Sequence, residues 1–239
     1  MRKFLTAEWR DLIMVNYEVD PDVLRPLVPA GTTLDLHEGR CFVSLVGFMF
    51  LNTRVLGVPI PFHVNFEEVN LRFYVKRETT DEIRRGVCFI QEIVPRNAIA
   101  LVARTFYGEP YEYCRMNNQR SNNGVEYGWR KADSENKINV RIGRNLGVPA
   151  AASHGEFIIE HYWGYTRRSA ARTDEYKVEH PKWELLEVQS TEIEVEFENV
   201  YGSTFAFLSK LEPYSILFAR GSEIAVYMGA KIRAESSRS

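Results

Sequence analysis

The amino-acid sequence predicts a mainly β, single-domain protein: a β-rich α+β fold whose sheet closes into a barrel or cone, with a few short helices added. Short apolar segments alternate with turn residues along most of the chain, a pattern typical of many short strands. Aromatic side chains, which suit a pleated sheet surface, make up 13% of the residues. No linker or internal repeat divides the 239 residues. We therefore expect one domain over residues 1–233 and a disordered polar tail over residues 234–239.

Charge and composition exclude several classes of protein. The formal net charge is −2, with acids and bases mixed along the chain, so no basic patch predicts a nucleic-acid partner. No uncharged apolar run approaches the roughly 20 residues that span a bilayer, and no signal peptide is evident. The scattered Cys41, Cys88 and Cys114 fit reduced thiols in a cytoplasmic protein. The expected partner is a small-molecule ligand rather than nucleic acid or a membrane, and a homo-oligomer stays open.

The first third of the chain predicts strands around one short helix. An apolar run at residues 10–18 indicates a buried strand. Asp20 can cap a helix that begins at Pro21 and carries an apolar stripe. We expect a further strand over residues 41–50 and a loop over residues 52–62, which two prolines interrupt.

Residues 66–77 give the clearest alternation in the sequence. Because successive side chains of a strand point to opposite faces, polar Glu68, Asn70, Arg72 and Tyr74 share one face and apolar residues fill the other. Such a polar face can be simply solvated, or it can line a barrel interior where its charges meet a ligand. We favour the interior because the apolar face also needs burial. Buried Glu68 and Arg72 would then require partners.

Residues 98–116 predict the wall of a pocket. An apolar strand enters a turn at residues 108–110, and polar or aromatic side chains follow at every other position. These are Tyr111, Tyr113 and Arg115, which would share one side of a strand.

Two arginines have a structural and a functional interpretation. Arg104 interrupts the apolar strand expected over residues 99–106, and Arg10 stands at the head of the first strand. Each is either a member of a structural ion pair or a clamp for a ligand carboxylate, which a guanidinium matches in shape. His161 and His180 are interpreted as structural histidines. No metal and no cofactor is expected, because the histidines are scattered and no nucleotide-binding or nucleophile motif is present.

The second half of the chain predicts three further elements. Residues 153–156 match a capping box, so a short helix should begin there. Alternating apolar residues indicate a strand over residues 183–198. A hairpin is expected from residues 214–219 and 223–228, across a turn at residues 220–222.

Several segments in the same order carry a resemblance to a known family. The segments are residues 12–17, 20–29, 66–75, 106–111 and 180–183. The first two resemble the opening of the acetoacetate decarboxylase-like superfamily, and the others are similar to its YqjF-like bacterial family of unknown function. The resemblance implies a decarboxylase-like barrel or cone around a mostly apolar cavity.

The resemblance also implies that the covalent chemistry is lost. In the decarboxylases a lysine pair follows a glycine-x-proline turn, and one lysine forms a Schiff base with a β-keto acid. This chain keeps the turn at residues 108–110, but Tyr111 and Glu112 stand where the lysines would be. A tyrosine cannot form an imine, so decarboxylation does not carry over.

Other cavity residues of the superfamily find counterparts here. Arg10, Glu68 and Arg104 match the family's N-terminal arginine, a strand glutamate and the arginine before the lysine turn. The second cavity glutamate of the family falls near Ser44, and this chain lacks it.

Three functions stay open at this point. The first is binding of a small organic, acidic ligand. The second is an enzyme without a Schiff base, of lyase or hydrolase type, with Glu68 as general acid or base and Tyr111 as proton donor. The third is a structural protein with a filled, inert barrel, which ranks below the other two. The side chains expected to contact the ligand are Arg10, Asn70, Arg72, Arg104, Tyr113 and Arg115.

Overall fold

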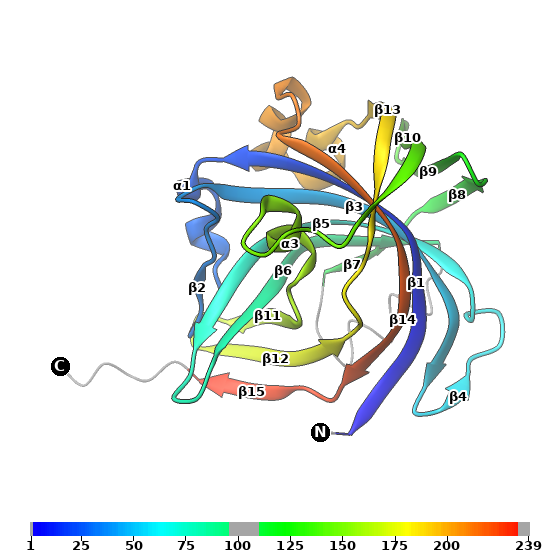
Figure 1. Ribbon diagram of the computed structural model, residues 1–239. Helices are drawn as coiled ribbons and strands as arrows, with labels where there is room; N and C mark the ends of the chain where they lie inside the picture. The colour runs from blue at the N-terminus through cyan, green and yellow to red at the C-terminus, as the bar shows by residue number, and fades with distance from the viewer. Residues whose placement is uncertain (1, 96–109, 234–239) are drawn as a thin grey trace.

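A computed structural model describes residues 2–95 and 110–233 of the chain, and one curved sheet dominates it (Figure 1). The mainly β class is therefore confirmed. The strands are β1 (Lys3–Val19), β2 (Thr33–Leu34), β3 (Cys41–Val55), β4 (Val58–Pro59), β5 (Phe66–Glu78), β6 (Ile83–Val94), β7 (Tyr111–Tyr113), β8 (Arg115–Arg120), β9 (Gly124–Lys131), β10 (Ser134–Gly147), β11 (Trp163–Ser169), β12 (Arg172–Glu179), β13 (Leu185–Glu194), β14 (Ser215–Tyr227) and β15 (Ala230–Arg233).

The helices are few and short. They are α1 (Pro21–Leu24), α3 (His154–Ile159) and α4 (Phe197–Tyr201), with the 3-10 helices η1 (Arg25–Leu27) and η2 (Ser203–Lys210). No helix in the described part of the chain has the length and apolar character to cross a membrane.

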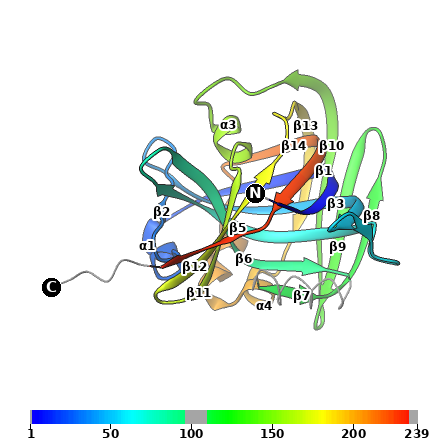
Figure 2. The same ribbon diagram turned by 90° about the horizontal axis from the view of Figure 1, so that it is seen from below.

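The sheet closes on itself in part. Its strands follow the order β15-β12-β11-β6-β5-β3-β1-β14-β13-β10-β9-β8, and a further pairing joins β12 to β14. That pairing matches Val178 with Val226 and Glu179 with Ala225. It closes β12, β11, β6, β5, β3, β1 and β14 into a strand ring, whereas β13, β10, β9 and β8 extend the sheet beyond the ring (Figures 1 and 2).

Both faces of β5 are buried, as its alternation predicts. The odd-numbered residues 69–75 pack in one core with α4 and η2. Phe66 and Tyr74, on the even-numbered face, belong to a second core that includes α3. Glu68 and Asn70 on this second face are 2% and 1% exposed. The interior location of the polar face is therefore confirmed.

The two predicted helix caps are present. The Asp20 side chain accepts a hydrogen bond of 2.9 Å from the backbone N–H of Asp22, and Pro21 occupies the first turn of α1. At α3 the Ser153 hydroxyl accepts from the N–H of Glu156 at 3.2 Å. In both places local sequence alone determines where the helix begins.

The hairpin expected at residues 214–228 is wrong, because β14 is one strand that passes straight through Gly221. β14 pairs with β1 on both sides of this glycine, from Asn16↔Ser215 to Lys3↔Tyr227. Gly221 adopts a φ of +74°, which glycine tolerates and which distorts a strand without reversing it. The pairing with β1 keeps both halves of the strand in line.

Two other boundaries also differ from the prediction. The strand expected over residues 183–198 ends at Glu194, and Phe197 begins α4, where it is 1% exposed. The loop expected over residues 52–62 contains a hairpin between β3 and β4. Its turn is formed by Leu56 and Gly57 with φ of +51° and +85°, as two-residue hairpin turns require.

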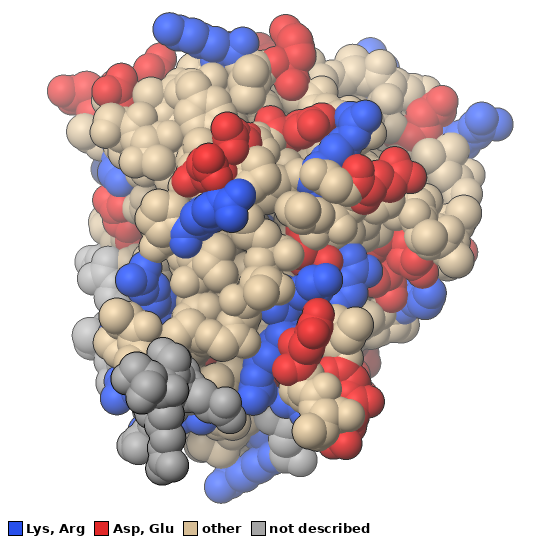
Figure 3. Space-filling view, turned by 90° about the vertical axis from the view of Figure 1, so that its left-hand side faces the viewer, with Lys and Arg blue, Asp and Glu red and all other residues tan. Residues whose placement is uncertain are grey.

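Some predictions fall outside the described residues. These are the strand over residues 99–106, the turn at residues 108–110 apart from Pro110, and the tail at residues 234–239. On the face drawn in Figure 3, basic and acidic side chains are interspersed, so this face carries no patch of a single charge sign.

Candidate functional site

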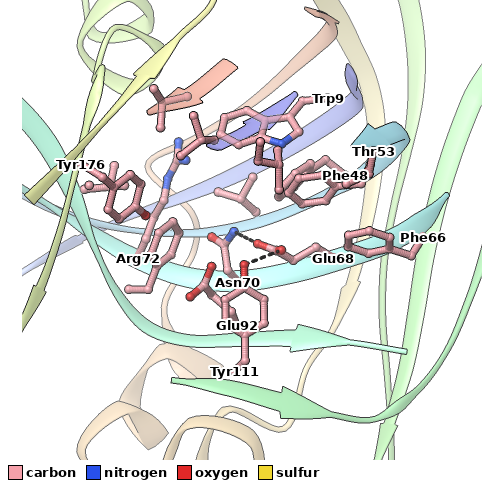
Figure 4. Close-up of a pocket in the computed structure, with 18 of the residues that line it drawn as sticks. Trp9, Phe48, Thr53, Phe66, Glu68, Asn70, Arg72, Glu92, Tyr111 and Tyr176 are labelled. Carbon is pink, nitrogen blue, oxygen red and sulfur yellow. Dashed lines mark hydrogen bonds between the residues drawn. The ribbon is translucent and has the colours of Figure 1, made fainter. Parts of the chain in front are cut away.

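A cavity of about 170 Å³ lies within the strand ring. Every strand of the ring contributes to its wall, together with Tyr111 from β7 (Figure 4). Most of the wall is aromatic or aliphatic. For scale, an apolar cavity of about 150 Å³ can hold benzene, so this one suits an organic molecule of about six to ten non-hydrogen atoms. The polar residues in its wall are Thr53, His63, Glu68, Asn70, Arg72, Glu92, Tyr111, His161 and Tyr176.

The alternation of β5 places three of the predicted residues side by side. Glu68, Asn70 and Arg72 follow one another on the face that borders the cavity (Figure 4). The Asn70 amide donates a hydrogen bond of 2.9 Å to Oε1 of Glu68.

Tyr111 reaches the same carboxylate from β7. This short strand pairs in parallel with β6 and sets Tyr111 beside Glu92. The Tyr111 phenol donates to Oε2 of Glu68 at 3.2 Å, and both residues are buried. Because each oxygen of Glu68 accepts a hydrogen bond, the carboxylate is held in one orientation beside the cavity.

Arg72 brings a positive charge to this wall. Its Nε is buried without a hydrogen-bond partner, and none of the ion pairs among the described residues includes it. Its guanidinium carbon lies 5.8 Å from the centre of the Tyr74 ring. Among the described residues, the expected partners therefore exist for Glu68 but not for Arg72. Arg72 is half-buried, and its buried Nε–H lacks an acceptor, which favours an anion at this position.

The other predicted site residues lie elsewhere. Arg10 donates to Glu8 at 2.8 Å and to the carbonyl of Gly221 at 3.0 Å, and it does not line the cavity. Tyr113 and Arg115 are exposed. β7 ends at Tyr113, so the alternation that begins at Tyr111 does not continue along one strand. Arg104 lies outside the described residues.

His161 is a wall residue with an unusual environment. Its side chain is 2% exposed, and its Nε2 lies 3.2 Å from Oδ2 of Asp35, which also accepts a 2.6 Å bond from Arg85. Nδ1 of His161 is buried and has no partner. Burial lowers the pKa of His161 to about 4, against the opposite influence of Asp35. At neutral pH the ring is therefore uncharged. With Nε2–H donating to Asp35, Nδ1 is left as an acceptor.

Acidification should destabilise the fold through His161. Its folded pKa of about 4 lies below the unfolded value of about 6.5, so protons bind the unfolded chain first and stability falls from pH 6.5 to pH 4. Between pH 7 and pH 5 we expect His161 to account for a loss of roughly 2 kcal/mol. Urea unfolding at both pH values checks this. Between the two pH values, the unfolding free energy of His161→Gln should fall by about 2 kcal/mol less than that of the parent. Equal falls in both proteins would contradict the attribution of this pH dependence to His161.

Sequence reasoning does not identify His161 or Glu92 as wall residues. The sequence does contain an indication for Glu92, because this acidic residue interrupts the apolar end of β6. His161 carries none, because its partner Asp35 lies 126 residues away in the chain. Within residues 2–95 and 110–233, no group of three or more histidine, cysteine or acidic side chains could hold a metal ion.

Solved structures share this fold at low sequence identity. The enduracididine biosynthesis enzyme MppR in complex with pyruvate has a TM-score of 0.67 and 12% identity, and the match covers 99% of this chain and 92% of MppR. Acetoacetate decarboxylase from Legionella pneumophila subsp. pneumophila str. Philadelphia 1 also has a TM-score of 0.67 and 12% identity. The match covers 98% of this chain and 89% of the decarboxylase. The acetoacetate decarboxylase-like fold is therefore confirmed.

Sequence comparison gives the family. YqjF of Bacillus subtilis (strain 168), an uncharacterized protein, is 31% identical over 194 residues, which cover 78% of this chain and 76% of YqjF. Residues 6–223 match the model of the DUF2071 family, described as an uncharacterized conserved protein. The chain therefore belongs to the DUF2071 family.

Proposed function

We propose that this protein binds a small organic carboxylate in the cavity of the strand ring without forming a Schiff base. The observation that carries the proposal is Arg72, a half-buried cation in a mostly apolar wall that forms no ion pair with an acidic side chain among the described residues. A ligand carboxylate would satisfy it, because the two oxygens match the fork of a guanidinium.

The rest of the wall supports the same assignment. Trp9 lies edge-on to Phe48 at 5.4 Å, and Phe50 stacks on Phe66 at 4.7 Å, so an apolar ligand body would meet aromatic surfaces. Asn70 of β5 and Tyr111 of β7, which both donate to Glu68, offer further polar contacts. The open cavity also favours binding over an inert, filled core.

The described wall offers no amine nucleophile. None of its residues is a lysine. Lys131 is the first lysine after Tyr111 in the sequence. Its ammonium group donates to the Glu112 carboxylate and to the Val200 carbonyl, each at 2.8 Å. A ligand here would therefore be held by non-covalent contacts.

Replacing Arg72 by Met should weaken carboxylate binding about 10- to 100-fold, because a hydrogen bond to a charged group contributes about 1.5–3 kcal/mol. Pyruvate is a suitable first probe, since MppR was solved with it. Isothermal titration with pyruvate, acetoacetate and lactate measures the effect. Arg141→Met, which removes an exposed arginine from β10, is the control and should bind like the parent.

Two results would overturn this proposal. One is equal binding by the parent and by Arg72→Met, or no binding of any of the three acids. The other is a covalent adduct on a lysine after borohydride treatment with acetoacetate, which would restore Schiff-base chemistry. Native mass spectrometry of freshly purified protein would show whether a ligand is already retained.

An enzyme without a Schiff base is the second candidate. The hydrogen bond between Tyr111 and Glu68 favours it, because it pairs a proton donor with a carboxylate beside the cavity. Arginine would stabilise an anion formed there. Turnover of a carboxylate that Glu68→Gln abolishes while binding persists would support this candidate. Turnover that survives Glu68→Gln would exclude Glu68 as its acid or base.

The cytoplasm is the location that we propose. Buried Cys41 and Cys114 are free thiols, which suits a reducing compartment.

A further inference from the structure

We infer that the preferred ligand is a hydroxy acid rather than the matching keto acid, and that His161, oriented by Asp35, is the residue that makes this choice. The inference rests on the proposed function, since it requires a carboxylate at Arg72. It adds a second contact, at Nδ1 of His161, another buried polar atom without a hydrogen-bond partner in a residue of the wall.

His161 is held by a contact of one ring nitrogen with Asp35, which leaves only the other nitrogen for a ligand. Nε2 faces Asp35, whose carboxylate is fixed by Arg85 at 2.6 Å and whose backbone N–H donates to the carbonyl of Tyr74 at 3.0 Å. The imidazole packs between the rings of Tyr74 and Phe157, at 4.7 and 5.1 Å. These contacts fix the ring orientation.

The tautomer follows from the same contacts. A carboxylate accepts hydrogen bonds, so Nε2 of His161 carries the proton and Nδ1 carries a lone pair. Burial lowers the pKa of His161 to about 4, which keeps the ring neutral near pH 7. Nδ1 is buried and unpartnered, in a residue that lines the cavity. A buried acceptor without a donor is costly, so a ligand that supplies an O–H or N–H gains by binding here.

Arg72 and His161 both line the cavity and lie beside the same aromatic ring. Both contact the ring of Tyr74: the Arg72 guanidinium carbon is 5.8 Å from its centre, and the His161 ring is 4.7 Å away. Arg72 offers a donor and a positive charge, and His161 offers an acceptor. A ligand complementary to both therefore combines a carboxylate with a hydrogen-bond donor.

The charges select a hydroxyl as that donor. An ammonium group at Nδ1 would approach the cationic Arg72, and Arg85 adds a second positive charge behind Asp35. A neutral hydroxyl avoids this repulsion. A ketone in the same place presents oxygen lone pairs to the lone pair of Nδ1 and leaves both unsatisfied.

Matched pairs of acids test the inference. Lactate and pyruvate differ only in the hydroxyl or ketone at one carbon, as do 3-hydroxybutyrate and acetoacetate. In isothermal titrations of the parent protein, each hydroxy acid should bind at least about tenfold more tightly than its keto partner. Equal affinities, or tighter binding of the keto acids, would overturn the inference but leave the proposed carboxylate site intact. If neither acid of a pair binds, the proposed function itself fails.

Substitutions then show whether His161 makes the choice. His161→Phe keeps an aromatic ring without the acceptor, and it should bring the affinity ratio of each pair close to one. His180→Phe is the matched control and should keep the parent ratio. His180 is also buried and stacks on Trp183 at 4.1 Å, but it does not line the cavity. A ratio unchanged by His161→Phe would overturn the role of His161.

A second variant, Asp35→Asn, tests which nitrogen of His161 carries the proton. In Asp35→Asn the new amide can donate to Nε2, which moves the imidazole proton to Nδ1 and turns that atom into a donor. The preference should then shift towards the keto acids. This shift separates recognition by His161 from a general loosening of the cavity, which would weaken both acids alike. Retention of the parent preference in Asp35→Asn would contradict the proposed tautomer.

Discussion

Gly221→Ala should destabilise the protein by at least about 3 kcal/mol. Gly221 has a φ of +74°, where an alanine is strained by roughly 1–2 kcal/mol. A Cβ atom at this position would also lie 1.9 Å from the carbonyl oxygen of Trp9. Relieving that overlap would separate β14 from β1 at the Arg10↔Gly221 pair, in the middle of their long ladder. Urea unfolding of parent and variant measures the difference.

Gly39→Ala is the matched control. Gly39 has a similar φ of +79°, but nothing lies within 4 Å of the Cβ that an alanine would add there. Only the backbone strain applies, so we expect a loss of about 1–2 kcal/mol. Equal losses at the two glycines would show that close approach of the strands does not determine the need for glycine at position 221.

Glu175→Ala should cost about 3 kcal/mol, because it removes the shared partner of two arginines. Glu175 on β12 has a side chain that is 2% exposed, and it accepts from Arg77 of β5 at 3.1 Å and from Arg84 of β6 at 2.7 Å. The arginine side chains are 28% and 27% exposed, so water partly compensates their loss. We therefore place the cost at the lower end of the range for broken buried pairs. Thermal or urea unfolding checks it.

Glu192→Ala is the control for Glu175→Ala, because it removes a carboxylate from an exposed ion pair. Glu192 binds Lys137 at 3.0 Å, but its side chain is 53% exposed, and exposed pairs contribute little. Its removal should therefore change stability far less than the removal of Glu175. A cost at Glu175 no larger than at Glu192 would mean that the Arg77–Glu175–Arg84 cluster does not stabilise the strand ring.

The sequence by itself determined the features that depend on local periodicity and capping. The class of the fold follows from its short apolar segments. The two buried faces of β5 follow from alternation, which places Glu68, Asn70 and Arg72 in one row. The start of α3 follows from the Ser153 cap. Each of these depends on residues within a few positions of one another.

Only the tertiary structure decided which segments meet. Residues 220–222 have the composition of a turn, yet β1 pairs with both sides of Gly221 and keeps β14 a single strand. Arg10 faces Glu8 and the carbonyl of Gly221 instead of the cavity, because that strand pairing sets its direction. Asp35 meets His161 across 126 residues, and no spacing in the chain encodes this contact. Strand register and long-range pairing depend on the whole sheet, so local sequence patterns cannot reveal them.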